Sequence, residues 1–167
     1  AHPDLVPLCR EVFDAALGDN PHQIDNKRDG GTITAAELLD VASTPGAITE
    51  EGLRNDVSVA LQYLAAWLQG SGAVAIFGLM EDVATAEIAR SQVWQWVYNE
   101  VVLTSGEPVT RSLVQRLIVE ELEKIRAALG GSYDAPRYEE ARQLFELVAL
   151  SDEFIEFLTL PAYERLP

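Results

Sequence analysis

Apolar positions recur at helical spacing along most of the chain, separated by short breaks rich in Gly, Pro and Asn. Apolar residues at positions i, i+3, i+4 and i+7 indicate an amphipathic helix whose apolar stripe faces a core. No alternation of Val, Ile and Thr is long enough to predict a strand. We therefore expect an all-α fold, a bundle of roughly five to seven helices. The predicted helices cover residues 3–17, 35–43, 49–69, 81–100, 110–129, 137–149 and 152–159.

Several predicted helices begin at residues whose side chains suit a helix start. Thr34 and Glu37 have the spacing of a capping box, in which the hydroxyl and the carboxylate satisfy free amide groups. Thr49 is followed by two glutamates, and acidic side chains are favourable in the positively polarised first turn. Thr110 and Ser151 are the predicted N-caps of two later helices.

The longest stretch without a charged residue, 57–80, has nearly the length of a membrane span. Gln62, Gln69 and the Gly-Ser-Gly sequence at 70–72 divide it into apolar pieces of roughly 12 and 8 residues. Pieces of that length are typical of a buried core. We therefore expect this stretch to contribute to the core of the bundle, and we expect no membrane partner.

The 167-residue length and the composition, 48% hydrophobic and 23% charged, are those of one globular domain or of a piece of a larger one. Twelve basic residues against twenty-seven acidic ones give a net charge of −15, which argues against nucleic acid and against a polybasic membrane anchor. The chain begins at Ala1, and Met80 is its one methionine. We therefore expect a segment cut from a longer protein, the alternative being removal of an initiator methionine.

Other chemically reactive side chains give weak signals. Cys9, the single cysteine, allows no internal disulfide, and its place on the apolar face of the first predicted helix favours a buried structural thiol. His2 and His22 lie far apart without obvious partners, so we expect neither to bind a metal. Residues 26–37 have the spacing of a calcium loop, but Arg28 stands where an oxygen ligand is needed.

Glu81 and Asp82 lie between the uncharged stretch and a predicted helix. An acid at such a boundary can be partly desolvated, which raises its pKa and makes it a stronger base. The N-terminus of the helix acts in the opposite direction, because it stabilises the anion. In the alternative interpretation Asp82 caps the helix and accepts a hydrogen bond from the amide near Thr85. Taken alone, the residues favour the capping role.

A longer motif surrounds these two acids. Residues 78–90 read Gly-Leu-Met-Glu-Asp-Val-Ala-Thr-Ala-Glu-Ile-Ala-Arg, and Ser-Gln-Val-Trp-Gln-Trp follows. This run closely resembles the malate synthase family of the A type. The resemblance extends, in the same order, to separate blocks at 1–7, 63–68 and 151–161. The chain departs from the usual residues of the family at a few positions, which leave the acid pair in place: Asp56, Ala73, Val83 and Ala89.

The resemblance implies an acyltransferase of the glyoxylate bypass, which condenses acetyl-CoA with glyoxylate and water to give malate and CoA. It also implies a (β/α)₈ barrel whose mouth is closed by a C-terminal helical plug. Residues 1–17 would be a remnant of the last helical region of the barrel, 18–48 a linker loop with a short helix, and 49–167 the plug. Asp82 matches the general base of the family, which removes a proton from the acetyl methyl group, and Glu81 would support it.

By the same resemblance, Mg²⁺ and an arginine stabilise the enolate, and both belong to the missing barrel. We therefore expect no metal ligand and no bound cofactor in this fragment, and no activity from it alone. Arg111, Arg116 and Arg126 are expected to be solvated helix charges, so the residues that contact CoA stay unassigned. The expected location is cytoplasmic. The alternative function is a non-catalytic acidic helical module that binds another protein, favoured by the surface charge and the three tryptophans.

Overall fold

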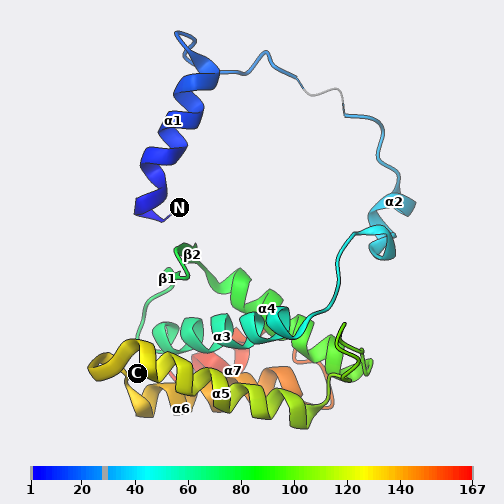
Figure 1. Cartoon of the computed structure of the whole chain (residues 1–167), viewed down its shortest axis with the longest axis vertical. Coiled ribbons are helices and arrows are strands. Elements are labelled where there is room, and N and C mark those ends of the chain that lie inside the picture. The colour runs from blue at the N-terminus through cyan, green and yellow to red at the C-terminus, as the bar shows by residue number, and fades with distance from the viewer. Residues whose placement is uncertain (1, 28–29, 167) are drawn as a thin grey trace. The chain divides into compact units, whose positions relative to one another are not determined.

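The structure is a computed structural model that describes residues 2–27 and 30–166 (Figure 1). Arg28, on which the calcium-loop argument depended, lies outside the described residues. The contacts between residues divide the chain into two compact units, 1–47 and 48–167. Each unit has its own helices.

The first unit contains two helices, α1 (Val6–Leu17) and α2 (Ala35–Leu39). The predicted capping box of α2 is confirmed, because the Thr34 hydroxyl accepts from the amide of Glu37 at 3.3 Å and the Glu37 carboxylate accepts from the amide of Thr34 at 2.7 Å. None of the described residues of this unit is buried. The prediction that Cys9 is a buried thiol is therefore wrong for this chain, since nothing in the first unit covers the apolar face of α1.

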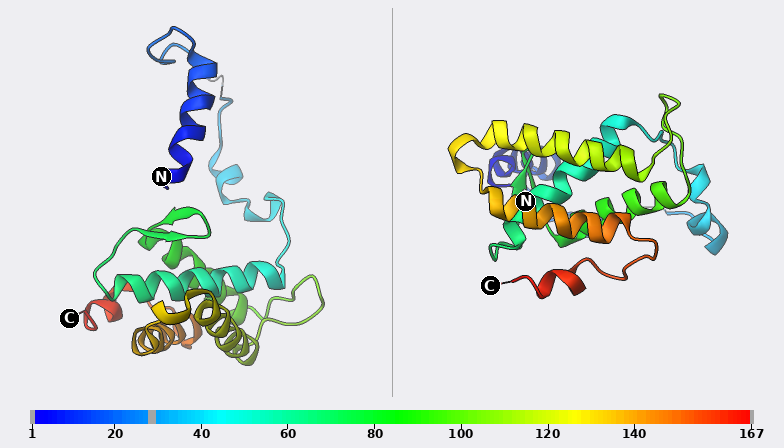
Figure 2. Two further views of the ribbon diagram at one scale, coloured as in Figure 1. Left: turned by 60° about the vertical axis from the view of Figure 1, so that its left-hand side comes forward. Right: turned by 90° about the horizontal axis from the view of Figure 1, so that it is seen from below.

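The second unit is the helical bundle that the sequence predicts. Its elements are α3 (Glu50–Trp67), β1 (Val74–Ile76), β2 (Leu79–Glu81), α4 (Val83–Tyr98), α5 (Arg111–Leu129), α6 (Ala135–Leu150) and α7 (Thr159–Tyr163). Helix α3 contacts α4, α5 and α6, and so forms the centre of the bundle (Figure 2). The largest buried apolar side chains line these contacts, among them Leu53, Tyr63, Leu64, Leu117, Leu144 and Phe145.

The central position of α3 explains the uncharged stretch that begins at Val57. Eight of the nine residues from Val57 to Ala65 are buried, because neighbouring helices cover several faces of α3. No helix among the described residues is long and apolar enough to cross a membrane. The predicted N-caps of the two long helices are confirmed: Thr49 accepts from the amide of Gly52 at 3.0 Å, and Thr110 from that of Leu113 at 3.1 Å.

Residues 74–81 form an antiparallel hairpin, and the absence of a predicted strand there is an error of the sequence analysis. The register pairs Val74 with Glu81 and Ile76 with Leu79, which leaves Phe77 and Gly78 as a two-residue turn. Both turn residues have positive φ, 50° and 75°, as a type I′ turn requires. Each strand is three residues long, which is too short to show an alternating pattern.

The predicted last helix over 152–159 is also wrong. Ser151 follows the end of α6 in an extended conformation, the segment 151–158 is irregular, and α7 starts later, at Thr159. Two carbonyl groups of this segment accept hydrogen bonds from side chains of α4, in place of the backbone hydrogen bonds that a helix would form. The indole of Trp94 donates to the carbonyl of Ser151 at 2.9 Å, and the guanidinium of Arg90 donates to that of Glu156 at 3.1 Å. These bonds satisfy the backbone without a helix.

Candidate functional site

Asp82 stands at the corner where β2 ends and α4 begins. Its backbone is extended, and its Oδ1 accepts from the amides of Ala84 at 2.9 Å and Thr85 at 3.4 Å. The capping role predicted for this residue is confirmed, and the N-terminus of α4 stabilises its negative charge. The side chain is exposed, so the partial desolvation considered from the sequence is not found for Asp82 in this chain. Oδ2 accepts no hydrogen bond from the described residues.

Glu81 holds the same turn of helix from the other side of the corner. Its Oε2 accepts from the hydroxyl of Thr85 at 2.6 Å, and its backbone pairs with Val74 in the hairpin. Thr85 therefore donates its amide to Asp82 and its hydroxyl to Glu81. These two bonds restrain the Asp82 side chain at the start of α4; the supporting role of Glu81 stays a prediction.

Tyr63 connects the corner with the central helix. Its hydroxyl donates to the carbonyl of Gly72 at 3.1 Å, which ties α3 to the loop before β1. Burial raises the pKa of Tyr63, and the negative charge of Asp82 raises it further. The Asp82 carboxylate is therefore close enough to α3 to act electrostatically on a group of the core.

A cavity of about 220 Å³ lies beside the corner, between α3, the hairpin and α4. It is lined by Asn55, Asp56, Val59, Phe77, Leu79, Glu81, Thr85, Ile88 and Ala89. The Oδ2 atom of Asp56 is sealed from solvent and has no hydrogen-bond partner among the described residues. Burial raises the pKa of Asp56 to about 7. An ionised carboxylate in this place would be an unpaired charge with little solvation.

From the sequence, Asp56 stood out as a departure from the family, and its burial was not predicted. One signal could have found it. Asp56 directly precedes Val57 and the uncharged stretch. Leu53, four residues before Val57, and Ala60, three residues after it, belong to the same apolar stripe of the helix. An acid next to such a stripe on a central helix is expected to be partly buried.

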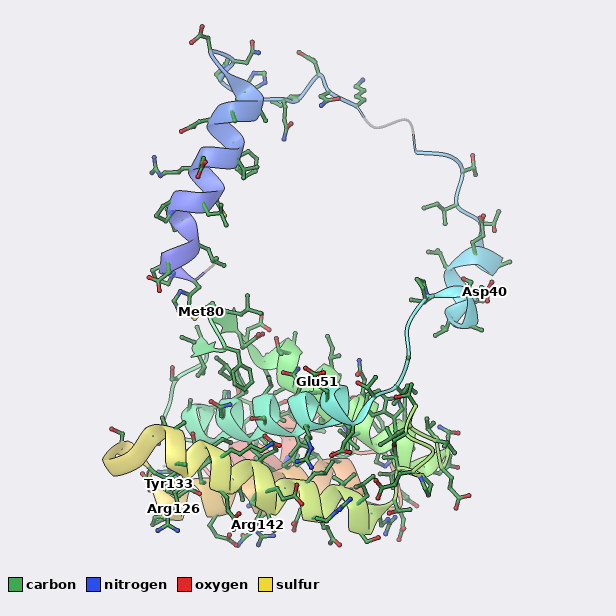
Figure 3. The ribbon with its side chains drawn as sticks, viewed as in Figure 1. Asp40, Glu51, Met80, Arg126, Tyr133 and Arg142 are labelled. Atoms are coloured by element: carbon green, nitrogen blue, oxygen red, sulfur yellow. The ribbon has the colours of Figure 1, made fainter. Side chains whose placement is uncertain are left out.

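Apolar side chains are exposed on the hairpin and at the start of α4. Phe77 is 67% exposed, and the other members of this surface are Leu79, Met80, Val83 and Ile88. Figure 3 labels Met80 on the hairpin. We call these five residues the hairpin surface. Adjacent exposed apolar side chains usually mark a contact with another molecule or domain.

Positively charged groups elsewhere in the second unit are engaged in local contacts. Arg111 pairs with Asp152, and Arg116 pairs with Glu107 at 3.1 Å; both arginines are about half exposed. Arg126 lies over the ring of Tyr133, and Figure 3 labels both residues. Within residues 2–27 and 30–166, no three His, Cys, Asp or Glu side chains lie close enough together to hold a metal ion. The site thus offers an exposed carboxylate on a corner held by hydrogen bonds to Ala84 and Thr85.

Comparison with known proteins assigns the part of the chain that contains Glu81 and Asp82 to a known family. The model of the family described as malate synthase, C-terminal, matches residues 47–166. Malate synthase of Streptomyces clavuligerus is 56% identical over 167 residues, and malate synthase A of Escherichia coli (strain K12) is 43% identical over 168 residues. Each alignment covers 99% of this chain and 31% of the relative. The glyoxysomal malate synthase of Zea mays is 41% identical over 172 residues. The chain spans less than a third of the length of these relatives.

Proposed function

The chain belongs to the malate synthase C-terminal family, and from that premise we propose that it supplies the catalytic base of an acyltransferase. In the longer protein, Asp82 takes a proton from the methyl group of acetyl-CoA. The resulting enolate attacks the aldehyde carbon of glyoxylate, and water then cleaves the thioester to release malate and CoA. The observation that carries this proposal is the exposed carboxylate of Asp82, whose Oδ2 accepts no hydrogen bond from the described residues.

The geometry of the corner suits a base for a weakly acidic proton. Such a base must be positioned before the reaction, because random orientations of the carboxylate would waste most encounters. Thr85 and the amide of Ala84 hold one side of Asp82, so the free Oδ2 has a defined direction. The N-terminus of α4 also interacts favourably with a negative charge at this position.

The enolate needs a positive charge close to the reacting atoms, and none of the cationic side chains in residues 2–27 and 30–166 pairs with Glu81 or Asp82. The described residues gather no set of side chains that fits a metal ion, so no step is assigned to one here. We propose that Mg²⁺ and an arginine are held by the rest of the longer protein, which would be a (β/α)₈ barrel. The hairpin surface, from Phe77 to Ile88, would contact that barrel and bring Asp82 to its mouth.

The proposed location is cytoplasmic, as expected from the sequence. The relatives from Zea mays and Brassica napus are named glyoxysomal, which is said of those proteins. Fractionation of cells that produce the longer protein tests the location. An organellar pool would contradict it.

A non-catalytic interaction module is the second candidate, and the hairpin surface is the observation that favours it. Its other support is weaker, because Trp94 stacks on Tyr98 and contacts Phe154, and Trp67 contacts Tyr163, so both tryptophans make internal contacts. The two candidates differ in the activity that they predict: the first predicts that the longer protein forms malate, and the second predicts no reaction.

The test compares the longer protein with residues 1–167 alone, both supplied with acetyl-CoA, glyoxylate and Mg²⁺. We expect the longer protein to form malate and free CoA and the 167-residue chain to form neither. A longer protein that releases no malate would refute the proposed activity. Turnover by the isolated chain would refute the view that the electrophile lies elsewhere.

A further inference from the structure

Two acidic residues from different elements line the cavity beside the corner. Asp56 comes from α3 and Glu81 from β2, and the other side chains that line the cavity are uncharged. Neither group has a cationic partner among the described residues. Two carboxylates that share a partly enclosed space repel each other when both are ionised.

Glu81 and Thr85 are also the residues that fix Asp82. Glu81 directly precedes Asp82 in the chain, and Thr85 donates to both acids, at 2.6 Å to Glu81 and at 3.4 Å to Asp82. Both line the cavity that Asp56 enters. A change of charge at Asp56 therefore acts on the two groups that determine the direction of Asp82.

We propose that Asp56 is a positioning residue for the catalytic corner: it acts on Asp82 through Glu81 and Thr85, which line the same cavity. The inference rests on the proposed function, since it concerns the base of that reaction. While Asp56 is uncharged, Glu81 is the single negative charge in the cavity and keeps its bond to the Thr85 hydroxyl. When Asp56 ionises, repulsion moves Glu81 away from Thr85, and Asp82 loses its fixed direction.

The pH range follows from the burial of Asp56. The pKa of its carboxyl is raised from the ordinary 3.8 to about 7 in the folded protein. Between these values the folded state binds more protons than the unfolded state, so stability falls as the pH rises through that range. The charge within the folded protein appears near pH 7. The effect on the corner is therefore small below pH 6 and complete above pH 8.

The test uses the longer protein with Asp56→Asn, which is close in shape and cannot ionise. We expect the variant and the wild type to have nearly equal kcat at pH 6. At pH 8.5 we expect kcat of the variant to be about three times that of the wild type or more. KM for acetyl-CoA should change little, because Asp56 does not contact the substrate. Glu51→Gln, which removes an exposed acid from the same helix (labelled in Figure 3), is the matched control and should leave the profile unchanged.

Repeating the comparison in protein that carries Glu81→Gln distinguishes an effect of Asp56 that acts through Glu81 from a general structural effect. In Glu81→Gln protein the second carboxylate is absent, so Asp56→Asn should give the same ratio of kcat at pH 6 and pH 8.5. A ratio that rises equally in both backgrounds would overturn the proposal, as would a ratio that does not depend on pH in the wild-type background.

The melting temperature gives a reading that does not depend on activity. The difference between Asp56→Asn and wild type should grow from pH 4 to pH 7 and stay constant above. A difference that is constant from pH 4 would mean that Asp56 is not held uncharged, and the proposal would fail. If the wild-type protein forms no malate, the proposed function fails. If it is active and Asp56→Asn leaves its pH profile unchanged, this inference alone fails.

Discussion

Replacing Arg90 by methionine should destabilise the second unit strongly, because this side chain joins α4 to the C-terminal segment. Arg90 is 1% exposed. Its guanidinium pairs with Glu87, donates to the carbonyl of Glu156 at 3.1 Å and lies 4.2 Å from the centre of the Phe154 ring. The other carboxylate oxygen of Glu87 accepts from the amide of Leu158 at 2.8 Å. Three further contacts, with Phe154, Glu156 and Leu158, thus depend on the Arg90–Glu87 ion pair.

Methionine keeps most of the apolar volume of Arg90 and removes its charge. Glu87 is then left without its cation at 25% exposure, and the carbonyl of Glu156 loses its donor. Breaking a buried pair from one side costs about 3–5 kcal/mol. Because Glu87 keeps some contact with solvent, we expect a loss of about 3 kcal/mol in the free energy of unfolding, near the lower end of that range.

Urea unfolding followed by circular dichroism measures this loss. Arg116→Met is the matched control, since Arg116 pairs with Glu107 at the surface, and such pairs contribute about 0–1 kcal/mol. Adding Glu87→Gln to Arg90→Met should restore about 1–2 kcal/mol, because it removes the unpaired charge. A loss below about 1 kcal/mol for Arg90→Met would refute the reasoning that this pair holds the C-terminal segment.

Two further substitutions test local geometry by the same measurement. Phe77→Asn should raise the free energy of unfolding by about 0.5–1 kcal/mol, because Asn tolerates the positive φ of 50° better than Phe does; a decrease would show that the ring of Phe77 stabilises the isolated unit. Thr110→Ala should lower it by about 1 kcal/mol through loss of the bond to the amide of Leu113, and an unchanged midpoint would contradict the capping role.

Helix starts were predictable because their chemistry is local. Thr49 and Thr110 each accept from an amide three residues later, so the residues that make the cap are adjacent in the sequence. The hairpin was not predictable in the same way. Its strands are too short for a pattern, and its turn uses Phe77 before Gly78 in place of the more usual Asn.

The segment after α6 shows a second limit of sequence reasoning. Its residues have helical propensity, and Ser151 with two following acids has the pattern of a helix start. The groups that hold it in an irregular conformation are Trp94 and Arg90, which are 57 and 66 positions away from their partners. No local rule includes such distant donors, so tertiary contacts decided the conformation.

The candidate site was predicted in part. The capping role of Asp82 followed from its neighbours and is confirmed, whereas its role as catalytic base rests on the family resemblance and stays a prediction. The charge environment of Asp56 could not be predicted, because it depends on how closely β2 and α4 approach α3. The sealing of one carboxylate oxygen is a property of packing, which the order of residues does not specify.

Asp82→Asn in the longer protein tests the central claim most directly. Asn also caps helices well, so the fold should be kept, while the side chain can no longer accept the proton. Asp134→Asn is the matched control, because Asp134 caps α6 by accepting from the amide of Arg137 at 3.2 Å. We predict that Asp82→Asn lowers kcat by about 100-fold or more with acetyl-CoA binding nearly unchanged, and that Asp134→Asn leaves kcat unchanged. Near-normal turnover by Asp82→Asn would contradict the assignment of the base.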